Sequence, residues 1–333
     1  MQRIAILGAG AWGTALAVAA RRAGRDVVLQ AHEPEVAEEI AGRRTNSRFL
    51  PGVNLDPAIA VAADPRAAPA GADAVLLAVP AQHLRSVLSA VAGDWPAGVP
   101  AVVCAKGIEQ CTGARMSEVV ASTLPSVPVA VLSGPSFAIE VARGLPTAVT
   151  LACADPAVCA ALPAAFDGAG LRIYSSSDVV GAELGGAIKN VLAIACGIVA
   201  GRKLGDNARA ALITRGLAEM VRLALRLGAK AETLMGLSGL GDLVLTCTAE
   251  QSRNFSLGAS LGKGRALPEI LAGRHSIAEG VHTAAEVVRL AGRVGVDMPI
   301  CAAVDAVLNR GADLHETIAG LLARPLRPEG WLA

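Results

Sequence analysis

The sequence is poor in aromatic residues. Only 2% of its 333 residues are Phe, Trp or Tyr, although 53% are hydrophobic. The core must therefore be built from Ala, Val, Leu and Ile. An excess of charge of either sign is also absent, because 30 basic residues oppose 29 acidic ones. This balance gives no indication of a nucleic-acid partner or of an anionic membrane surface.

Signals for secretion, membrane insertion and metal binding are missing as well. The first residues show no long apolar region followed by a small-residue cleavage site. The longest uncharged stretch, residues 119–139, contains three prolines, which favours a buried strand flanked by turns over a membrane span. Seven scattered cysteines form no C-x-x-C motif, and five histidines show no metal-ligand spacing. We therefore expect a cytoplasmic protein with reduced thiols, no membrane span and no metal.

The first half of the chain alternates short apolar runs with helical patterns, which predicts a parallel sheet covered by helices on both faces. The predicted strands are residues 3–8, 26–30, 72–80, 99–106, 127–134, 146–153 and 171–177. Further on, strand-like runs nearly vanish, and helical spacing covers residues 179–200, 208–227 and 283–291. A chain of this length is consistent with about two domains. We predict an α/β domain over residues 1–177 and an all-helical domain over residues 178–333.

A glycine-rich turn follows the first predicted strand. Gly8, Gly10 and Gly13 form a G-x-G-x-x-G pattern directly before a predicted helix over residues 11–22. The first glycine permits a tight turn, the second lets a pyrophosphate approach the backbone, and the third lets helix and strand pack closely. The N-terminus of the helix then attracts the phosphates. In this context the pattern predicts a Rossmann-type dinucleotide-binding domain; a glycine-rich turn that has lost its ligand is the alternative.

The end of the second strand bears on the choice of dinucleotide. An NAD-only enzyme usually has Asp or Glu there to hold the ribose 2′-OH. Here the strand ends at Gln30, and His32 and Glu33 follow. His32 could face a 2′-phosphate, which favours NADP, but Glu33 could still reach a ribose hydroxyl. NADP and NAD both remain candidates.

A lysine stands in an otherwise apolar helical stretch, "AELGGAIKNV" (residues 182–191). The residues three and four positions from Lys189 include no carboxylate, so no local ion pair can neutralise it. It needs a partner from elsewhere in the fold, or its pKa falls. Either outcome suits a group that gives a proton to a carbonyl oxygen undergoing reduction. A snorkelling lysine on a partly exposed helix is the alternative.

Further polar residues could complete a site for a phosphorylated substrate. Asp242 and Thr246 are four residues apart on one helical face. The Ser-Arg-Asn sequence at residues 252–254 offers a bidentate cation with neutral donors, as a phosphate requires. Lys106 ends a predicted strand, at the edge where α/β sheets bind ligands, although a solvated loop lysine is equally consistent. The turn at residues 133–138 offers backbone N–H groups and hydroxyls to an anion.

Several long segments in the same order resemble the bacterial-type NAD(P)-dependent glycerol-3-phosphate dehydrogenase family from end to end. They are residues 8–17, 106–113, 133–148, 183–198, 205–220, 236–248, 252–258 and 278–284. The resemblance implies a two-domain enzyme that reduces dihydroxyacetone phosphate to sn-glycerol 3-phosphate with NADPH or NADH, reversibly. It also implies a role in supplying glycerophospholipid synthesis.

The family's site residues can be carried over position by position. Its general acid/base falls on Lys189, and we expect Asp242 and Thr246 to orient this lysine. The implied substrate contacts are Lys106, Gly134, Ser136, Lys189, Asp242, Ser252, Arg253 and Asn254. The implied cofactor contacts are Gly8, Gly10, Ala11, Trp12, Gly13, His32, Lys106, Ala138, Arg253, Ile277 and Glu279. Position 11 is often Ser in the family, so Ala11 lacks one hydroxyl. We also expect Lys106 to lower the pKa of Lys189 by like-charge repulsion.

Two other functions fit the same architecture. A 3-hydroxy-acid dehydrogenase also joins a Rossmann domain to a helical domain and uses a helix lysine, but its substrate carboxylate needs an anchor other than residues 252–254. A non-catalytic dinucleotide sensor has no need of the proton donor Lys189 with Asp242. The oligomeric state stays open, with a homodimer as one alternative.

Overall fold

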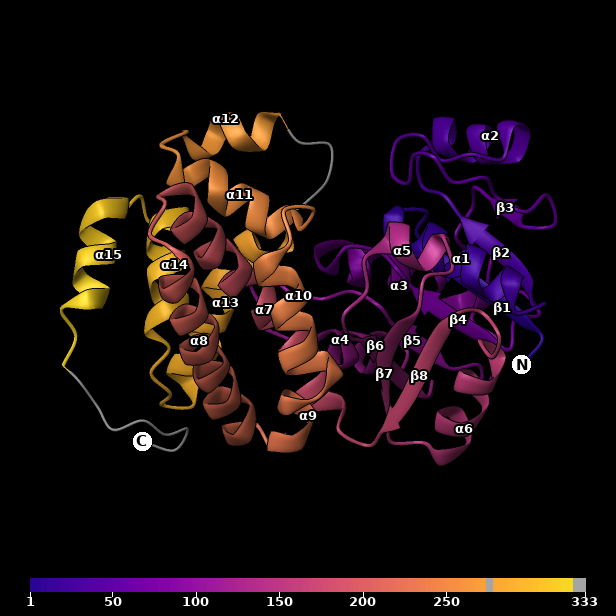
Figure 1. Cartoon of the computed structure of the whole chain (residues 1–333). Helices are drawn as coiled ribbons and strands as arrows, with labels where there is room; N and C mark the ends of the chain where they lie inside the picture. The colour runs from indigo at the N-terminus through magenta and orange to yellow at the C-terminus, as the bar shows by residue number, and fades with distance from the viewer. Residues whose placement is uncertain (274–277, 326–333) are drawn as a thin grey trace. The chain divides into compact units, whose positions relative to one another are not determined.

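The computed structural model describes residues 1–273 and 278–325, which form two compact units (Figure 1). One unit combines Met1–Ala105 with Met116–Val179 and is an α/β structure. The other combines Lys106–Arg115 with the chain from Val180 onward and is helical apart from that first segment. The predicted fold class, an α/β dinucleotide-binding domain followed by an all-α domain, is confirmed.

The α/β unit contains one eight-stranded sheet with the order β3-β2-β1-β4-β5-β6-β7-β8. Its strands are β1 (Arg3–Leu7), β2 (Asp26–Gln30), β3 (Ala60–Ala62), β4 (Ala74–Leu77), β5 (Ala101–Val103), β6 (Val129–Ser133), β7 (Thr147–Cys153) and β8 (Leu171–Ser176). In the centre, Ile4 of β1 lies between Val27 of β2 and Ala74 of β4. Each predicted strand is present, and the edge strand β3 was not predicted.

The expectation of a wholly parallel sheet is wrong at one edge. Strand β7 runs antiparallel to β6, so that Leu132 lies opposite Leu151. Strand β8 is parallel to β7 in turn. The apolar runs were correctly identified as strands, but the length and period of an apolar run do not indicate whether the strand pairs in parallel or antiparallel. Pairing direction is set by tertiary structure.

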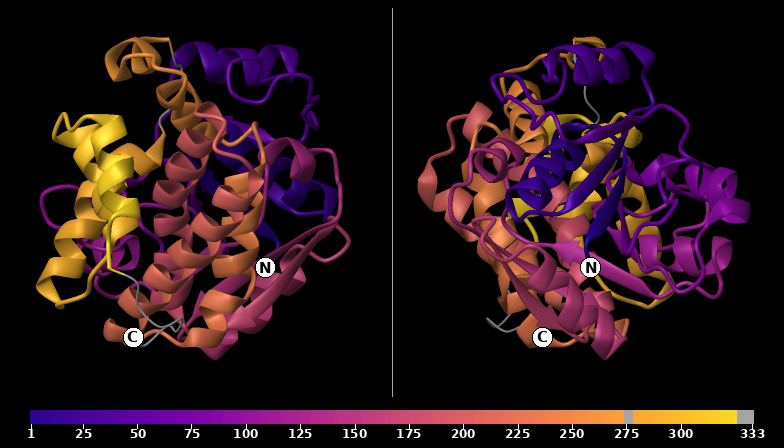
Figure 2. Two further views of the ribbon diagram at one scale, coloured as in Figure 1. Left: turned by 60° about the vertical axis from the view of Figure 1, so that its left-hand side comes forward. Right: turned by 90° about the vertical axis from the view of Figure 1, so that its right-hand side faces the viewer.

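Helices cover the sheet on both faces (Figure 2). They are α1 (Ala11–Arg22), α2 (Pro34–Arg43), α3 (Leu84–Val91), α4 (Met116–Thr123), α5 (Ala138–Ala142) and α6 (Pro156–Ala165), with 3₁₀ turns at Ala81–His83 and Ala92–Asp94. The β1–α1–β2 and β4–α3–β5 crossovers step outward in opposite directions from the β1–β4 pair. Because such crossovers are right-handed, α1 and α3 lie on opposite faces. The carboxyl ends of β1 and β4 therefore form the switch point at which this architecture binds ligands.

The helical unit is built around one long buried helix. Its helices are α7 (Val179–Gly201), α8 (Asp206–Arg226), α9 (Ala231–Met235), α10 (Asp242–Thr248), α11 (Arg253–Gly262), α12 (Leu267–Ala272), α13 (Glu279–Arg293), α14 (Pro299–Asn309) and α15 (Leu314–Leu322). Within the described ranges, α7 alone is long and apolar enough to cross a bilayer, yet 89% of its most apolar window is buried inside the protein. Such a helix, apolar on all sides, is typical of a protein core.

The segment Lys106–Arg115 belongs with the helical unit, although it lies between β5 and α4 in the chain. Ile108 is part of the helical core, and the Lys106 carbonyl accepts a hydrogen bond from the Asn190 side chain of α7. The single domain boundary near residue 177 stays a prediction, and the compact units of the structure divide the chain somewhat differently. The main division falls between residues 179 and 180, and residues 106–115 are a separate excursion. These contacts are long-range, so local sequence patterns carry no signal for them.

Candidate active site

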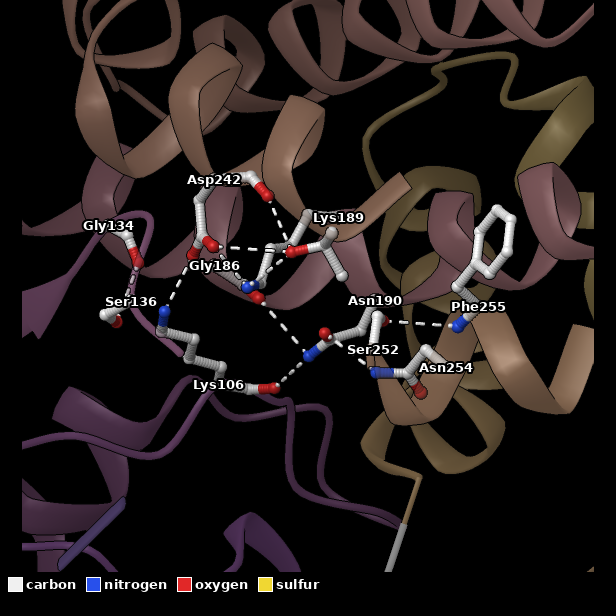
Figure 3. A network of polar contacts seen from close by, with 11 residues as sticks. Lys106, Gly134, Ser136, Gly186, Lys189, Asn190, Asp242, Ser252, Asn254 and Phe255 are labelled. Atoms are coloured by element: carbon white, nitrogen blue, oxygen red, sulfur yellow. Dashed lines mark hydrogen bonds and ion pairs between the residues drawn. The ribbon is translucent and has the colours of Figure 1, made fainter. Parts of the chain in front are cut away.

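The side chains of Lys106, Lys189 and Asp242 point toward one another in the helical unit (Figure 3), and Thr246 joins them. Lys189 of α7 donates hydrogen bonds to Asp242 Oδ1 and, at 2.9 Å, to Thr246 Oγ1 of α10. Lys106 Nζ lies 2.7 Å from the other carboxylate oxygen, Asp242 Oδ2. The Thr246 hydroxyl in turn donates a hydrogen bond to the backbone carbonyl of Asp242 at 2.6 Å. One carboxylate thus holds two lysines, and the hydroxyl fixes the direction of one of them.

A close approach of backbones brings α10 to α7. The turn before α10, Leu237–Gly241, is π-helical, and Gly241 N donates to Gly236 O at 3.0 Å. A Cβ atom at Gly185 of α7 would lie 2.3 Å from Ser238 O, so only glycine allows this turn to rest on the helix. Wide turns of this kind are rare and frequent at functional sites. Here the turn delivers Asp242, the first residue of α10, to Lys189.

The environment of Lys189 makes its proton easy to release. Burial lowers the pKa of Lys189 to about 8; Asp242 opposes this shift and Lys106 adds to it. Lys189 is only 7% exposed, so the snorkelling alternative is wrong. Both outcomes that the sequence allowed are present, a partner and a lowered pKa. With two ammonium groups against one carboxylate, the cluster keeps a net positive charge that favours an anionic ligand or a developing oxyanion.

Residues 252–254 lie at the start of α11. The Ser252 hydroxyl caps this helix by accepting from Phe255 N at 3.2 Å. The Asn254 amide is buried; its Oδ1 accepts from Gly280 N at 3.1 Å, and its Nδ2 donates to Asn190 Oδ1 at 2.9 Å. Arg253 is exposed at the first helical position. Two of these three side chains therefore have structural hydrogen bonds that the sequence did not predict.

Asn190 is a polar residue of this cluster that sequence reasoning missed. Its Nδ2 donates to Lys106 O at 3.0 Å, and its Oδ1 receives the Asn254 bond. It therefore connects the start of α11 with the backbone of Lys106. Its position directly after Lys189, in an otherwise apolar helix, was the available signal. Of the remaining predicted residues of this unit, Glu279 begins α13 and Ile277 lies outside the described residues.

The glycine-rich turn of the α/β unit has the geometry that the pattern predicted. Gly8 has φ +101°, which disfavours other residues. A Cβ atom at Gly13 would lie 1.9 Å from Gly8 O, so helix and turn touch there. A Cβ atom at Gly10 would have no protein neighbour within 4 Å. This open side of the backbone precedes Ala11, the first residue of α1, where the N–H groups of a helix have no helical partners.

Asn46 holds this turn from a distant loop and was not predicted. Its side chain is buried and donates to Ala9 O at 2.8 Å and to Thr14 Oγ1 at 2.9 Å. Thr14 in turn donates to Ala9 O at 3.2 Å. No periodicity or spacing links Asn46 to the glycine motif, so only the fold shows the connection.

The other predicted residues of the α/β unit lie at the ends of its strands. His32 is exposed just beyond β2, and Glu33 is the N-cap residue of α2. Beyond β6, Gly134 adopts φ +146° and its carbonyl accepts from Ser136 Oγ at 3.1 Å. Ala138 is the first residue of α5.

Comparisons with known proteins agree with this architecture. Residues 3–159 match the N-terminal family model of NAD-dependent glycerol-3-phosphate dehydrogenase, and residues 178–319 match the C-terminal model. A glycerol-3-phosphate dehydrogenase [NAD(P)+] of Rhodospirillum rubrum is 60% identical over 330 residues, which are 99% of this chain and 95% of that protein. The chain belongs to the NAD(P)-dependent glycerol-3-phosphate dehydrogenase family.

Further relatives are similar to this chain over nearly its full length. The enzyme of Parvibaculum lavamentivorans is 55% identical, covering 98% of each chain. The crystal structure of glycerol-3-phosphate dehydrogenase from Coxiella burnetii superposes with a TM-score of 0.93 at 41% identity, over 97% of this chain and 99% of that one. Both units are therefore parts of one family-wide architecture.

The dinucleotide of the family fits the residues around the turn. Gly10 leaves room for a ligand, and the first turn of α1 carries no acidic side chain that would repel phosphate. In the described part of the chain, Trp12 Nε1 is a buried donor with no hydrogen-bond partner. Such a group calls for an acceptor from outside the protein, because an unsatisfied buried donor is costly.

Proposed function

We propose that this chain catalyses the reversible NAD(P)H-dependent reduction of dihydroxyacetone phosphate to sn-glycerol 3-phosphate. The observation that carries this proposal is the buried Lys189, held by Asp242 and Thr246 and accompanied by Lys106. Family membership supports the same substrate and the same cofactor class. A nicotinamide bound there would supply the hydride for the C2 carbonyl.

Lys189 acts as the general acid. With a pKa near 8 it is mostly protonated at neutral pH, yet it is acidic enough to give its proton to the developing alkoxide. Asp242 and Thr246 hold the ammonium in one direction, which limits the rotamers from which it can donate. Lys106 adds positive potential where the oxyanion forms. In the oxidative direction the neutral amine takes the proton back.

The phosphate is bound by the start of α11. Arg253 offers a guanidinium fork, the N-terminus of a ten-residue helix adds a partial positive charge, and the Asn254 amide carries an N–H beyond the one given to Asn190. Ser252 can donate its hydroxyl proton while accepting the capping bond. Gly134 and Ser136 stay predicted substrate contacts, and Arg253 with Glu279 stays a predicted contact of the cofactor.

The cofactor is held by the turn from Gly8 to Gly13 and by Trp12, with Ala138 as a further predicted contact. His32, exposed beyond β2, would favour NADPH by facing its 2′-phosphate, and Glu33 keeps NADH as an alternative. We place the reaction in the cytoplasm, in the reductive direction that supplies glycerophospholipid synthesis. All seven cysteines are thiols that form no disulfide, which supports a reducing compartment. The homodimer stays a prediction, which sedimentation equilibrium tests.

A substrate panel tests the proposal. The purified chain is given dihydroxyacetone phosphate with NADPH or NADH, and a 3-hydroxy acid with NADP or NAD. We expect rapid NADPH oxidation with dihydroxyacetone phosphate and no turnover of the 3-hydroxy acid. The reverse preference would identify a 3-hydroxy-acid dehydrogenase. NADPH binding without turnover of either substrate would identify a dinucleotide sensor.

A further inference from the structure

The segment Lys106–Arg115 is a small hairpin that brings a lysine of the N-terminal half of the chain into the helical unit. Ile108 and Arg115 form an antiparallel bridge, and Glu109 N donates to Ala114 O at 2.9 Å. Because the two arms are paired, the position of Arg115 at one end is coupled to that of Lys106 at the other.

Helix α7 holds both ends of this hairpin. Asn190 donates to the Lys106 carbonyl at 3.0 Å, and Glu183 Oε2 lies 3.5 Å from Arg115 Nη1. Residues 183 and 190 are two helical turns apart on one face, roughly 10 Å along the axis. Between these anchors Ile108 is buried in the helical core. The backbone of Lys106 is thus held against α7, the helix that carries Lys189.

We propose that the Arg115–Glu183 ion pair is a positioning device that keeps the Lys106 ammonium at Asp242, beside the proposed acid Lys189. The inference rests on the proposed function and adds two residues to its machinery. Arg115 is joined to Lys106 by the paired arms of the hairpin, and Glu183 holds Arg115 from the helix that also binds the Lys106 carbonyl, so both residues act through the hairpin.

The burial of the pair suits this task. The Glu183 side chain is 5% exposed and that of Arg115 is 20% exposed. Removing the partner of a carboxylate at such depth destabilises the folded protein, because a buried charge is left unpaired. The pair therefore resists opening more than a surface ion pair does. Lys106 has a flexible four-carbon stem, and a fixed backbone reduces the number of positions that its ammonium samples.

The pair has a consequence for the acid. The charge of Lys106 favours the neutral form of Lys189, and Lys106 also competes for Asp242. Among the described residues of the helical unit, Asp242, Lys106 and Cys247 are the titratable groups that interact with Lys189. The hydrogen bond with Cys196, together with burial, raises the pKa of the Cys247 thiol, which is therefore neutral near pH 8. A loosened hairpin moves a positive charge away, and the pKa of Lys189 then rises.

The test is the pH dependence of kcat for dihydroxyacetone phosphate reduction. Activity falls as pH rises through the pKa of the acid, so Arg115→Ala is expected to move this alkaline limb upward by about 0.5 to 1 pH unit. Arg115→Lys, which keeps the charge, should restore most of the shift. If Arg115→Ala does not fold, the double variant R115Q/E183Q loosens the hairpin without leaving a buried charge unpaired. Arg310→Ala, which breaks a pair with the buried Asp305 on α14, is the matched control and should leave the limb in place.

The double variant Lys106→Ala/Arg115→Ala identifies the route. Lys106→Ala alone should move the limb upward, and adding Arg115→Ala should move it no further if Arg115 acts through Lys106 as proposed. An unmoved limb in both Arg115→Ala and R115Q/E183Q, with a shifted limb in Lys106→Ala, would overturn the inference and leave the proposed function standing. A limb that no substitution at position 106 or 189 affects would instead overturn the acid role of Lys189, and absent turnover of dihydroxyacetone phosphate by the native chain would overturn the proposed function itself.

Discussion

Replacing Asp242 by Asn should make Lys189 too acidic to stay protonated at neutral pH. The carboxylate is the group that holds the ammonium form of Lys189 against burial and against the charge of Lys106. Loss of an opposite charge at hydrogen-bond distance lowers a pKa by roughly 1–3 units. From about 8 in the native protein, the pKa of Lys189 would fall to near 6.

The effect on rate follows from the protonated fraction. At pH 7 this fraction falls from about 90% at a pKa of 8 to about 10% at a pKa of 6, which is a loss of about 10-fold in kcat. Looser orientation of Lys189 and Lys106 adds to this loss. Reduction by Asp242→Asn should therefore recover as the pH is lowered toward 5.5, whereas the native enzyme gains little from acid.

The assay is kcat for NADPH oxidation with saturating dihydroxyacetone phosphate, measured across pH. Asp305→Asn is the matched control, since Asp305 is another buried carboxylate of the helical unit but lies on α14. The control should lose stability and keep the native alkaline limb. An alkaline limb of Asp242→Asn that stays near pH 8 or moves upward would refute the reasoning, because a lost carboxylate cannot favour the ammonium.

Three further predictions concern substrate, stability and cofactor. Arg253→Lys should lower kcat/KM for dihydroxyacetone phosphate by about 10- to 150-fold, mainly through KM, because a compact ammonium replaces the bidentate guanidinium. Replacement of the exposed Arg202 by Gln is the control, and equal effects of the two substitutions would contradict the role of Arg253 in binding phosphate. Burial raises the pKa of Glu219 to about 7, so the folded protein binds this proton more tightly than the unfolded chain does. Between pH 4.5 and 8 the free energy of unfolding of the native protein should therefore fall by about 3 kcal/mol more than that of Glu219→Gln. Denaturant unfolding at several pH values measures this difference, and parallel stability curves for the two proteins would refute it. His32→Ala should raise KM for NADPH about 5-fold and leave KM for NADH unchanged, whereas an effect on NADH alone would point to the ribose diol.

Much of the fold follows from local patterns. Apolar runs between turn residues identified seven strands, and the G-x-G-x-x-G pattern located the turn after β1. Asp242 and Thr246, four residues apart, were expected on one helical face; both lie on α10, and both accept hydrogen bonds from Lys189 of α7. These features depend on spacing within one element, which is what a sequence shows directly.

Other features depend on tertiary packing and were missed. The three-residue β3 is too short to give a periodic signal, and the direction of β7 is set by its neighbours. Asn46 reaches the glycine turn from more than 30 residues away, and residues 106–115 join helices that follow much later in the chain. No local pattern records such contacts, so the hydrogen bond from Asn190 of α7 to the Lys106 carbonyl was visible only in the structure.

The most direct test of the account is the turnover of Lys189→Ala, with NADPH binding measured on the same preparation. Turnover of dihydroxyacetone phosphate should fall by roughly 10²–10⁴, the usual share of general acid catalysis, while the Kd for NADPH stays unchanged. Native turnover in this variant would show that another group protonates the alkoxide and would contradict the central claim.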